Sequence, residues 1–188
     1  MIVLKNKEDC CGCKSCEQIC PRNCISMKVD NEGFWYPIID KEFCIECGLC
    51  EKVCPELLKK EPITPIACYA CYTSDEQVRL KSSSGGVFTL LAEYVIAQKG
   101  VVFGAKFDTQ WNVVHGYTDS INGLSEFRGS KYVQSDIGSS FAQVRSFLKQ
   151  GRQVLFTGTP CQVSGLNLFL NKEYEKGPQY SPQLKLFI

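Results

Sequence analysis

Eight of the thirteen cysteines in this chain stand in two short runs that have the same spacing. The first run comprises Cys10, Cys13, Cys16 and Cys20, and the second comprises Cys44, Cys47, Cys50 and Cys54. Each run reads C-x2-C-x2-C-x3-C-P, and the second repeats the first at an offset of 34 residues, from Cys10 to Cys44. Two copies of such a tight loop constrain the fold strongly, because their sulfur atoms must converge on a bound group or on one another.

This spacing is the pattern of bacterial two-cluster ferredoxins, in which three thiolates of a run bind one cubane and the fourth serves the other. The proline after each fourth cysteine fixes φ and removes a donor, so the chain turns away from the metal. The pattern therefore predicts two [4Fe–4S] clusters. The predicted ligands of the first are Cys10, Cys13, Cys16 and Cys54, and those of the second are Cys44, Cys47, Cys50 and Cys20.

A disulfide scaffold and a zinc module are the two alternatives for so many cysteines. Zinc sites usually pair a C-x2-C with a distant second pair rather than with a run of four. The chain starts without the anatomy of a signal peptide, and thiolate ligands need a reducing compartment. We therefore favour iron–sulfur clusters in a cytoplasmic protein. The longest apolar stretch, Val87–Ala97, contains Glu93 and is too short to predict a membrane span.

Charge gives little support for a nucleic-acid partner. The 188 residues have a formal net charge of +1, and no basic tract stands out. Two oxidised cubanes with their thiolates would each add a charge of about −2 to the N-terminal part. This acidity suits docking to a complementary redox partner protein, such as a reduced ferredoxin.

The composition changes near residue 60, which predicts two domains and an α+β fold class. Residues 1–60 form the ferredoxin-type domain, with a hairpin of Ile25–Val29 and Phe34–Ile38 between the runs. Residues 61–67 are charged and proline-punctuated, as in a linker. Residues 68–188 alternate strand and helix signals, as in an α/β domain.

The expected strands of the second domain are Ala67–Thr73, Val101–Phe107, Asn112–Tyr117 and Val154–Thr157. An amphipathic helix should follow Gly86 with one apolar face, made of Val87, Leu90, Leu91, Tyr94 and Val95. A helical turn is expected at Leu124–Phe127, and further helices at Phe141–Lys149 and Gln162–Leu170.

Two loops precede helices in a way that suits an anionic ligand. In the first, Ser82–Ser84 and the Gly85-Gly86 pair stand where free N–H groups and the positive end of a helix favour a phosphate. A plain serine cap with a glycine turn is the alternative. In the second, Pro160 suits a first helical turn, and Cys161 would lie at the positive helix end, where a thiolate is stabilised. A buried inert cysteine is the alternative there.

Three segments together resemble the beta subunit of coenzyme F-420 hydrogenase/dehydrogenase: residues 75–88, 127–135 and 154–162. They occur in the order of that family, behind a dicluster ferredoxin domain that many members carry, and the resemblance covers about Lys5 to Tyr174. It implies an iron–sulfur flavoprotein oxidoreductase subunit that relays electrons between the cubanes, FAD and a small-molecule acceptor. The deazaflavin is not assigned as that acceptor. The residues that the resemblance implies for FAD are Ser83, Ser84, Gly85, Gly86, Lys131, Thr159 and Cys161.

The chain departs from the family near its end. Relatives continue with more of the same catalytic domain, whereas the residues after Tyr174 match nothing recognisable, so the domain looks truncated and its flavin and substrate sites incomplete. An electron-transfer protein of ferredoxin type, without catalytic activity of its own, is therefore the alternative function. A purely structural role for the clusters ranks below both. No catalytic residue is predicted.

The remaining reactive side chains have two interpretations each. The only histidine, His115, is expected to be a structural residue of a strand. Cys11 and Cys24 border ligand cysteines and are expected to be packed bystanders, while Cys161 leaves open a third cluster of the kind that some relatives hold. Lys131 would neutralise a phosphate or a reduced flavin, or be an ordinary surface lysine. Cys68 and Cys71 form either a dithiol or part of a strand.

Overall fold

The computed structural model describes residues 2–58, 67–173 and 184–187. Helices and strands are mixed, which confirms the α+β class. Contacts divide the described residues into two units: a cysteine unit of residues 2–58 and 159–173, and a sheet unit of residues 67–158 and 184–187. The last predicted helix thus groups with the cysteines rather than with the sheet. Residues 61–66 of the predicted linker lie outside the described residues.

The cysteine unit contains the predicted hairpin. Strand β1 (Ile25–Val29) pairs antiparallel with β2 (Trp35–Ile39), which begins one residue later than expected. Asp30 closes the turn, because its carboxylate accepts hydrogen bonds from the N–H groups of Glu32 and Phe34, each at 3.0 Å. Its other oxygen lies 2.6 Å from Lys7 Nζ. The helices of this unit are η1 (Lys7–Asp9), α1 (Ser15–Ile19), η2 (Glu51–Val53) and α5 (Pro160–Glu173).

The core of the cysteine unit is rich in sulfur. Its buried cluster contains Ile2, Cys16, Cys24, Ile25, Met27, Cys50 and Cys54. Four of these seven side chains are cysteines, and Trp35 and Ile39 pack against them from the hairpin. So few aliphatic side chains supply little hydrophobic stabilisation for a small unit. A group bound by the cysteines would complete this core.

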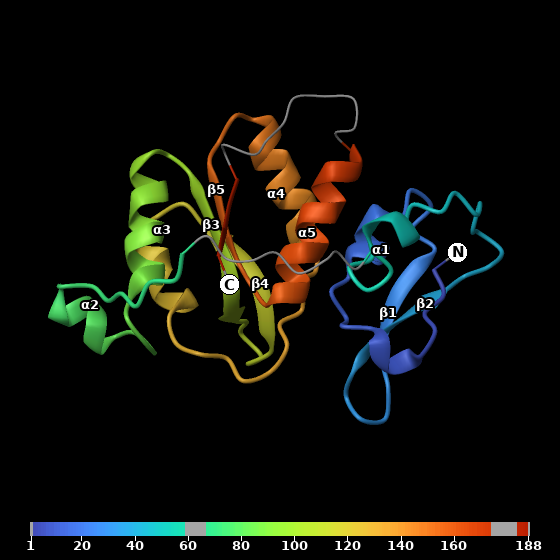
Figure 1. Ribbon diagram of the computed structural model, residues 1–188, viewed down its shortest axis with the longest axis horizontal. Helices are drawn as coiled ribbons and strands as arrows, with labels where there is room; N and C mark the ends of the chain where they lie inside the picture. The colour runs from blue at the N-terminus through green and yellow to red at the C-terminus, as the bar shows by residue number, and fades with distance from the viewer. Residues whose placement is uncertain (1, 59–66, 174–183, 188) are drawn as a thin grey trace. The chain divides into compact units, whose positions relative to one another are not determined.

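The sheet unit is built on a mixed sheet with the strand order β4-β3-β5-β6. Strand β3 (Val101–Phe107) pairs antiparallel with β4 (Val113–Thr118) and parallel with β5 (Val154–Thr157). Helices α3 (Val87–Ala97) and α4 (Ser140–Lys149) lie on opposite sides of this sheet (Figure 1). Residues Val101–Gly104 are accordingly all buried. The two remaining helices are α2 (Glu76–Leu80) and η3 (Asn122–Phe127).

The chain end contributes an unforeseen strand to the sheet. Strand β6 (Leu184–Phe187) pairs parallel with β5, in register from Val154↔Leu184 to Thr157↔Phe187. It lies in the tail that matched nothing recognisable. The backbone of this tail therefore extends the sheet beyond β5.

One predicted strand is wrong. Residues 67–73 have no regular structure, and Tyr69 and Tyr72 are strongly exposed. The hydrogen bond from Thr73 N–H to the carbonyl of Gly85, at 2.7 Å, ties this segment to the following loop instead of to a strand. The apolar pattern of residues 67–72 misled the prediction, because their side chains do not face a core.

The predicted apolar face of α3 is also wrong in part. Leu90, Leu91 and Tyr94 are exposed, while Thr89, Ala92 and Val95 are buried. Ala92 and Val95 pack against Val102 and Leu155 of the sheet, together with Leu124. The helix is apolar on several sides, so periodicity alone does not select the buried face.

The structure places His115 on β4 in a role that is structural, as expected. Its Nε2 lies 2.9 Å from the carbonyl oxygen of Thr157, which can only accept, so Nε2 carries the proton. Nδ1 then accepts from the hydroxyl of Ser135 at 2.7 Å. The ring stacks on Phe156 at a centroid distance of 5.1 Å. Burial lowers the pKa of His115, so the neutral imidazole ties β4 to β5.

The buried neutral His115 should make the sheet unit acid-sensitive. Below the ordinary pKa of 6.5 the unfolded chain binds a proton that the folded imidazole resists, so stability is lost as the pH falls. We expect His115→Gln to lower the free energy of unfolding by about 1–3 kcal/mol at neutral pH, because a buried partner of His115 loses its hydrogen bond. The variant should also lose less stability than the wild type between about pH 7.5 and 5. Denaturant unfolding followed by aromatic fluorescence at both pH values measures this. Parallel pH profiles of the two proteins would contradict the assignment.

Candidate metal centre

The eight cysteines of the two runs line two separate cavities of the cysteine unit. The first cavity is bordered by Cys10, Cys13, Cys16 and Cys54. The second is bordered by Cys20, Cys44, Cys47 and Cys50. Each cavity thus contains three cysteines of one run and the last cysteine of the other. This grouping is the one expected for two cubanes with exchanged fourth ligands.

Two very short helices produce the exchange. Helix α1 contains Cys16, which borders the first cavity, and ends just before Cys20, which borders the second. Helix η2 lies between Cys50, at the second cavity, and Cys54, at the first. Each helix spans a single turn or little more, so consecutive cysteines of one run reach neighbouring cavities. The proline that follows each run then turns the chain away.

The loops around the two cavities share a left-handed backbone conformation at equivalent positions, although the residue types at these positions differ. In the first run, Gly12 and Lys14 flank the second cysteine with φ of 63° and 61°. In the second run, Glu46 and Gly48 occupy the same two positions with φ of 53° and 71°. Successive residues in left-handed and right-handed conformations turn N–H groups toward one point and form a nest for an anionic group, as in many iron–sulfur sites. The glycine occupies opposite positions in the two runs, so sequence comparison of the repeats does not reveal the match.

The protonation of the cavity cysteines sets a cost for metal binding. Burial raises the pKa of Cys10, Cys16 and Cys54, whereas a hydrogen bond from Cys11 lowers the pKa of Cys13 to about 7. Thiolate ligands must lose their protons, so metal binding at this cavity releases protons, and the binding energy has to cover that cost. Across the described ranges, no group of three or more His, Cys, Asp or Glu side chains is placed to hold a single metal ion.

The two cavities differ in exposure. Cys47 is exposed at the second cavity, where Phe43 and Ile45 are also exposed. At the first cavity, Cys13, Cys16 and Cys54 are all buried. The second site therefore has an edge at the surface, whereas at the first only Cys10 among the four cysteines is partly exposed.

Helix α5 covers part of the first run although it is distant in sequence. Gly165 lies so close to Ser15 of α1 that a Cβ at this position would collide with the Ser15 hydroxyl, and it would lie 3.3 Å from Cys13 Sγ. Ser15 is fully buried, and its hydroxyl contacts Cys13 Sγ at 3.4 Å. A glycine at this point of α5 is what permits the close approach.

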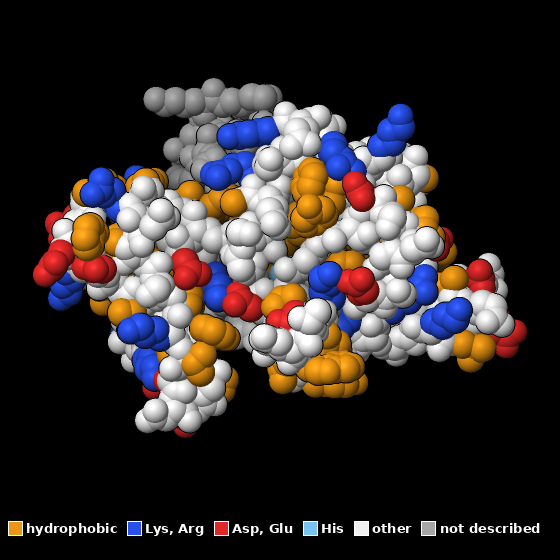
Figure 2. All heavy atoms as spheres, turned by 180° about the vertical axis from the view of Figure 1, so that it is seen from behind, with side chains coloured by type: hydrophobic (Ala, Val, Ile, Leu, Met, Phe, Trp, Pro, Cys, Tyr) orange, Lys and Arg blue, Asp and Glu red, His pale blue; other side chains and the backbone are white. Residues whose placement is uncertain are grey.

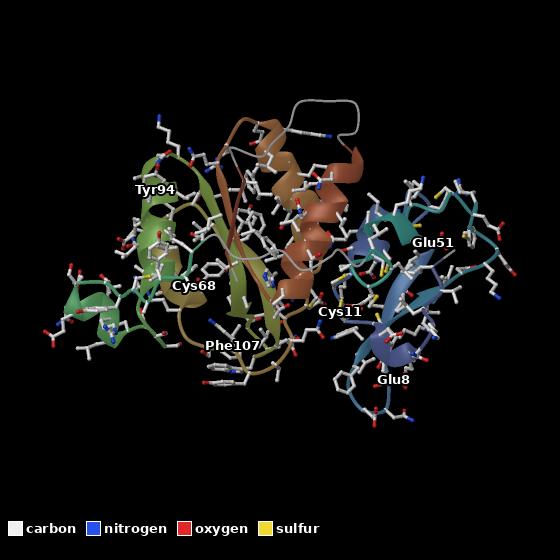
Figure 3. All side chains as sticks on the ribbon, viewed as in Figure 1. Glu8, Cys11, Glu51, Cys68, Tyr94 and Phe107 are labelled. Carbon is white, nitrogen blue, oxygen red and sulfur yellow. The ribbon has the colours of Figure 1, made fainter. Side chains whose placement is uncertain are left out.

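The start of α5 places two predicted flavin residues beside the cysteines. Thr159 N–H donates to Gln162 Oε1 at 3.0 Å, which is half of a capping box. The Thr159 hydroxyl lies 3.2 Å from Cys161 Sγ. A hydrogen bond from Cys11, assisted by Thr159 and by backbone N–H groups of the helix start, lowers the pKa of Cys161 to about 6. Cys161 is half-buried rather than fully buried, and Cys11, expected as a bystander, is its partner. Figure 3 labels Cys11 in the cysteine unit.

The other predicted flavin residues lie in the sheet unit. Ser83 accepts a hydrogen bond from Ser130 N–H at 2.9 Å, which joins the loop before α3 to the loop that contains Lys131. Lys131 Nζ donates to the carbonyls of Glu126 and Arg128, at 3.1 and 2.9 Å, and burial lowers its pKa. Ser84 lies in the same loop as Ser83.

The glycines of that loop pack against protein rather than framing an open cradle. A Cβ on Gly85 would collide with the backbone carbonyl of Cys71, and one on Gly86 would lie 2.7 Å from the methyl group of Thr73. Chain packing therefore already explains both glycines. The described loop does not fit a flavin phosphate at these two residues, and no step of a mechanism is derived through FAD.

The three other cysteines have distinct surroundings. Cys24 Sγ lies 3.4 Å from Cys20 Sγ, and it also contacts Cys44. Cys68 and Cys71 are exposed in the irregular segment of the sheet unit (Figure 3). Their placement removes the strand as an explanation of this C-x2-C pair.

Comparison with known proteins finds a match only for the part of the chain that contains the two cysteine runs. Residues 9–57 match the family model of the 4Fe-4S dicluster domain. No curated protein matches the chain. None of the helices within the described residues has the length and apolarity needed to cross a membrane. On the face shown in Figure 2, Lys and Arg are interspersed with Asp and Glu. The N-terminal part of the chain thus contains a ferredoxin-type 4Fe–4S domain, and such a domain implies electron transfer.

The exchanged ligands predict which cysteines lose protection together. In Cys54→Ser, we expect Cys10, Cys13 and Cys16 to become reactive toward iodoacetamide while Cys44, Cys47 and Cys50 stay protected, because only the first site lacks a thiolate. Cys20→Ser should give the reciprocal result, and iron should fall by about half in each. Mass spectrometry of alkylated peptides from anaerobic protein measures both. Cys24→Ser is the control and should leave every ligand protected. Loss of protection at the second run in Cys54→Ser would show that the fourth ligands are not exchanged.

Removal of iron should unfold the cysteine unit and spare the sheet unit. Three of the seven buried core side chains of the cysteine unit, Cys16, Cys50 and Cys54, are predicted ligands, so we expect its folding to depend on the bound group. After chelation of iron, we expect amide protons of β1, β2 and α1 to exchange rapidly while those of β3 and β5 stay protected. Hydrogen-exchange mass spectrometry before and after chelation measures this, and reconstitution with iron and sulfide is the control. Equal loss of protection in both units would contradict the prediction.

Proposed function

We propose that this chain is an electron-transfer protein that carries two [4Fe–4S] clusters with exchanged fourth ligands. The observation that carries the proposal is the pair of cavities, each bordered by three cysteines of one run and the last of the other. Bound there, each cluster would supply one-electron chemistry at the low potentials typical of ferredoxins. The reducing conditions that thiolates need place the protein in the cytoplasm under this proposal.

The chain's own residues set the distance between the two centres. Cys16 lies inside helix α1 and Cys20 directly follows that helix, so only about 6 Å of helix rise separates their backbones. Helix η2 imposes a similar limit on Cys50 and Cys54. Both connections are direct, so the two sites are held close enough for electrons to pass between them. A purely structural role for the clusters would not need two sites at this separation.

The difference in exposure suggests a direction for electron flow. The second site reaches the surface near Cys47, with exposed Phe43 and Ile45 beside it. This apolar edge suits the transient docking of a redox partner protein such as a reduced ferredoxin. The first site is buried and contacts α5. Electrons would enter at the second site and move toward the first.

A flavin-dependent oxidoreductase is the second candidate function. The hydrogen bond from Ser130 to Ser83 joins two segments that resemble the coenzyme F-420 hydrogenase/dehydrogenase beta subunit. The N-terminus of α3 also lacks a side-chain cap, so its N–H groups are available to an anion. In this candidate, FAD would pass electrons to a small-molecule acceptor. The packing of Gly85 and Gly86 against residues 71–73 counts against it.

Composition of the purified protein separates the two candidates. Protein prepared without oxygen should contain about eight iron and eight acid-labile sulfide atoms per chain. Protein without flavin would support the electron-transfer protein, whereas about one FAD per chain would establish the flavin-dependent oxidoreductase. Dithionite titration followed by electron paramagnetic resonance should then show two one-electron centres. About four iron atoms, or zinc in their place, would refute the two-cluster proposal.

A further inference from the structure

Cys11 and Cys161 form a thiol pair that the proposed electron carrier does not use. They are 150 residues apart in sequence, and both belong to the cysteine unit. Cys161 Sγ lies 4.0 Å from the carbonyl oxygen of Cys11, and the two thiols hydrogen bond to each other. Both side chains are partly exposed, so a small thiol reagent can reach them. Neither is a predicted cluster ligand.

Contacts at the start of helix α5 fix the backbone position of Cys161. The bond from Thr159 N–H to Gln162 Oε1 fixes the start of α5, and Gln162 is almost fully buried. One helical turn after Cys161, Gly165 contacts α1 beside Cys13. The local hydrogen bond fixes the first turn of α5, and the contact of Gly165 holds this end of the helix against the first cysteine run. The approach of Cys161 to Cys11 follows from them.

Cys11 also contacts Cys13, a predicted ligand of the first site that lies two residues along the chain. Its thiol hydrogen bonds with both Cys13 and Cys161. A thiol has one proton to donate, so the two sulfur atoms compete for it. When Cys13 binds a cluster, its sulfur bears negative charge and is the stronger acceptor. The reduced Cys11 thiol thus supplies a hydrogen bond to a ligand of the first site.

We propose that Cys11 and Cys161 are a redox modification site that closes reversibly into a disulfide. Both S–H bonds break, the sulfur–sulfur bond forms, and two electrons and two protons pass to an oxidised low-molecular-weight disulfide of the glutathione class, which becomes two thiols. The bonded Cys11 has no proton left to donate to Cys13. Hydrogen bonds to cluster sulfurs raise the reduction potential. The disulfide therefore lowers the potential of the first site, a consequence that rests on the proposed two-cluster function.

The other non-ligand cysteines do not offer the same chemistry. Cys24 is also close to the clusters, but its sulfur neighbours Cys20 and Cys44 are both predicted ligands. A disulfide there would remove a ligand from the second site. Cys24 is therefore the matched control for Cys11. Like Cys11, it contacts a predicted ligand, but the two sulfur atoms beside it are both predicted ligands.

The disulfide itself is tested on the full chain with its clusters bound. Anaerobic protein is equilibrated with glutathione buffers of graded potential, trapped with N-ethylmaleimide in acid, digested and mapped by mass spectrometry. We expect one cross-linked peptide pair, Cys11 with Cys161, whose fraction follows a two-electron Nernst curve while the iron content stays constant. Alkylation of both residues at every potential would overturn the proposal, and so would separate glutathione adducts on each without a cross-link.

The effect on the first site is tested by potentials rather than by activity. Electron paramagnetic resonance titrations should show one centre shifting to lower potential when the wild type is oxidised by the glutathione buffer. Cys161→Ser should abolish the shift, Cys11→Ala, which removes the donor, should hold the potential low in both buffers, and Cys24→Ala should behave as the wild type. A cross-link without any shift would refute the role of the Cys11 hydrogen bond. Low iron in the untreated wild type would instead refute the proposed function, while the peptide map would still decide whether the disulfide forms.

Discussion

Each cysteine cavity takes its last sulfur from the other run, and the cysteine unit depends on this exchange. Cys20 and Cys54 cross between the sites at the ends of α1 and η2, so neither loop can close its own site alone. Cys54 belongs to the buried core of the unit, together with Cys16 and Cys50, and Cys20 packs against it. The packing of the core and the spacing of the two cavities are therefore consequences of one arrangement. A unit this small has few other means of burying apolar surface.

Helix α5 extends that arrangement to a segment far along the chain. Gly165 lets the helix approach Ser15 and Cys13, and the capping of Gln162 onto Thr159 holds its first turn. Three cysteines of the first site are buried, while the second has an exposed edge at Cys47. Two cysteine runs of the same spacing thus differ in their exposure to solvent. Helix α5 also places a thiol where it can respond to the redox state of its surroundings.

Prediction from sequence succeeded where local pattern and burial agree. The hairpin, β3, β5 and α4 were located within one residue or so, because each has its own turn or cap signals and a regular apolar pattern. It failed at residues 67–73, which look like a strand but find no partner, and at Leu90, Leu91 and Tyr94, which look like a core face but are exposed. Gly85 and Gly86 suited a phosphate loop, yet neighbouring backbone and side-chain atoms fill the space beside them. In each failure, burial or exposure depends on packing with other segments of the chain, which the local hydrophobic pattern does not specify.

The sequence by itself determined the ligand chemistry and the repeat, because thiolate number and spacing are local properties of a short loop. It also predicted the exchange of Cys20 and Cys54, since in the two-cluster pattern the fourth cysteine of each run serves the other cluster. Only the tertiary structure decided that Gly12 and Glu46 share a left-handed conformation, that His115 joins two strands, and that Cys161 meets Cys11. These features depend on backbone dihedrals and on packing between residues distant in sequence, which residue spacing does not specify.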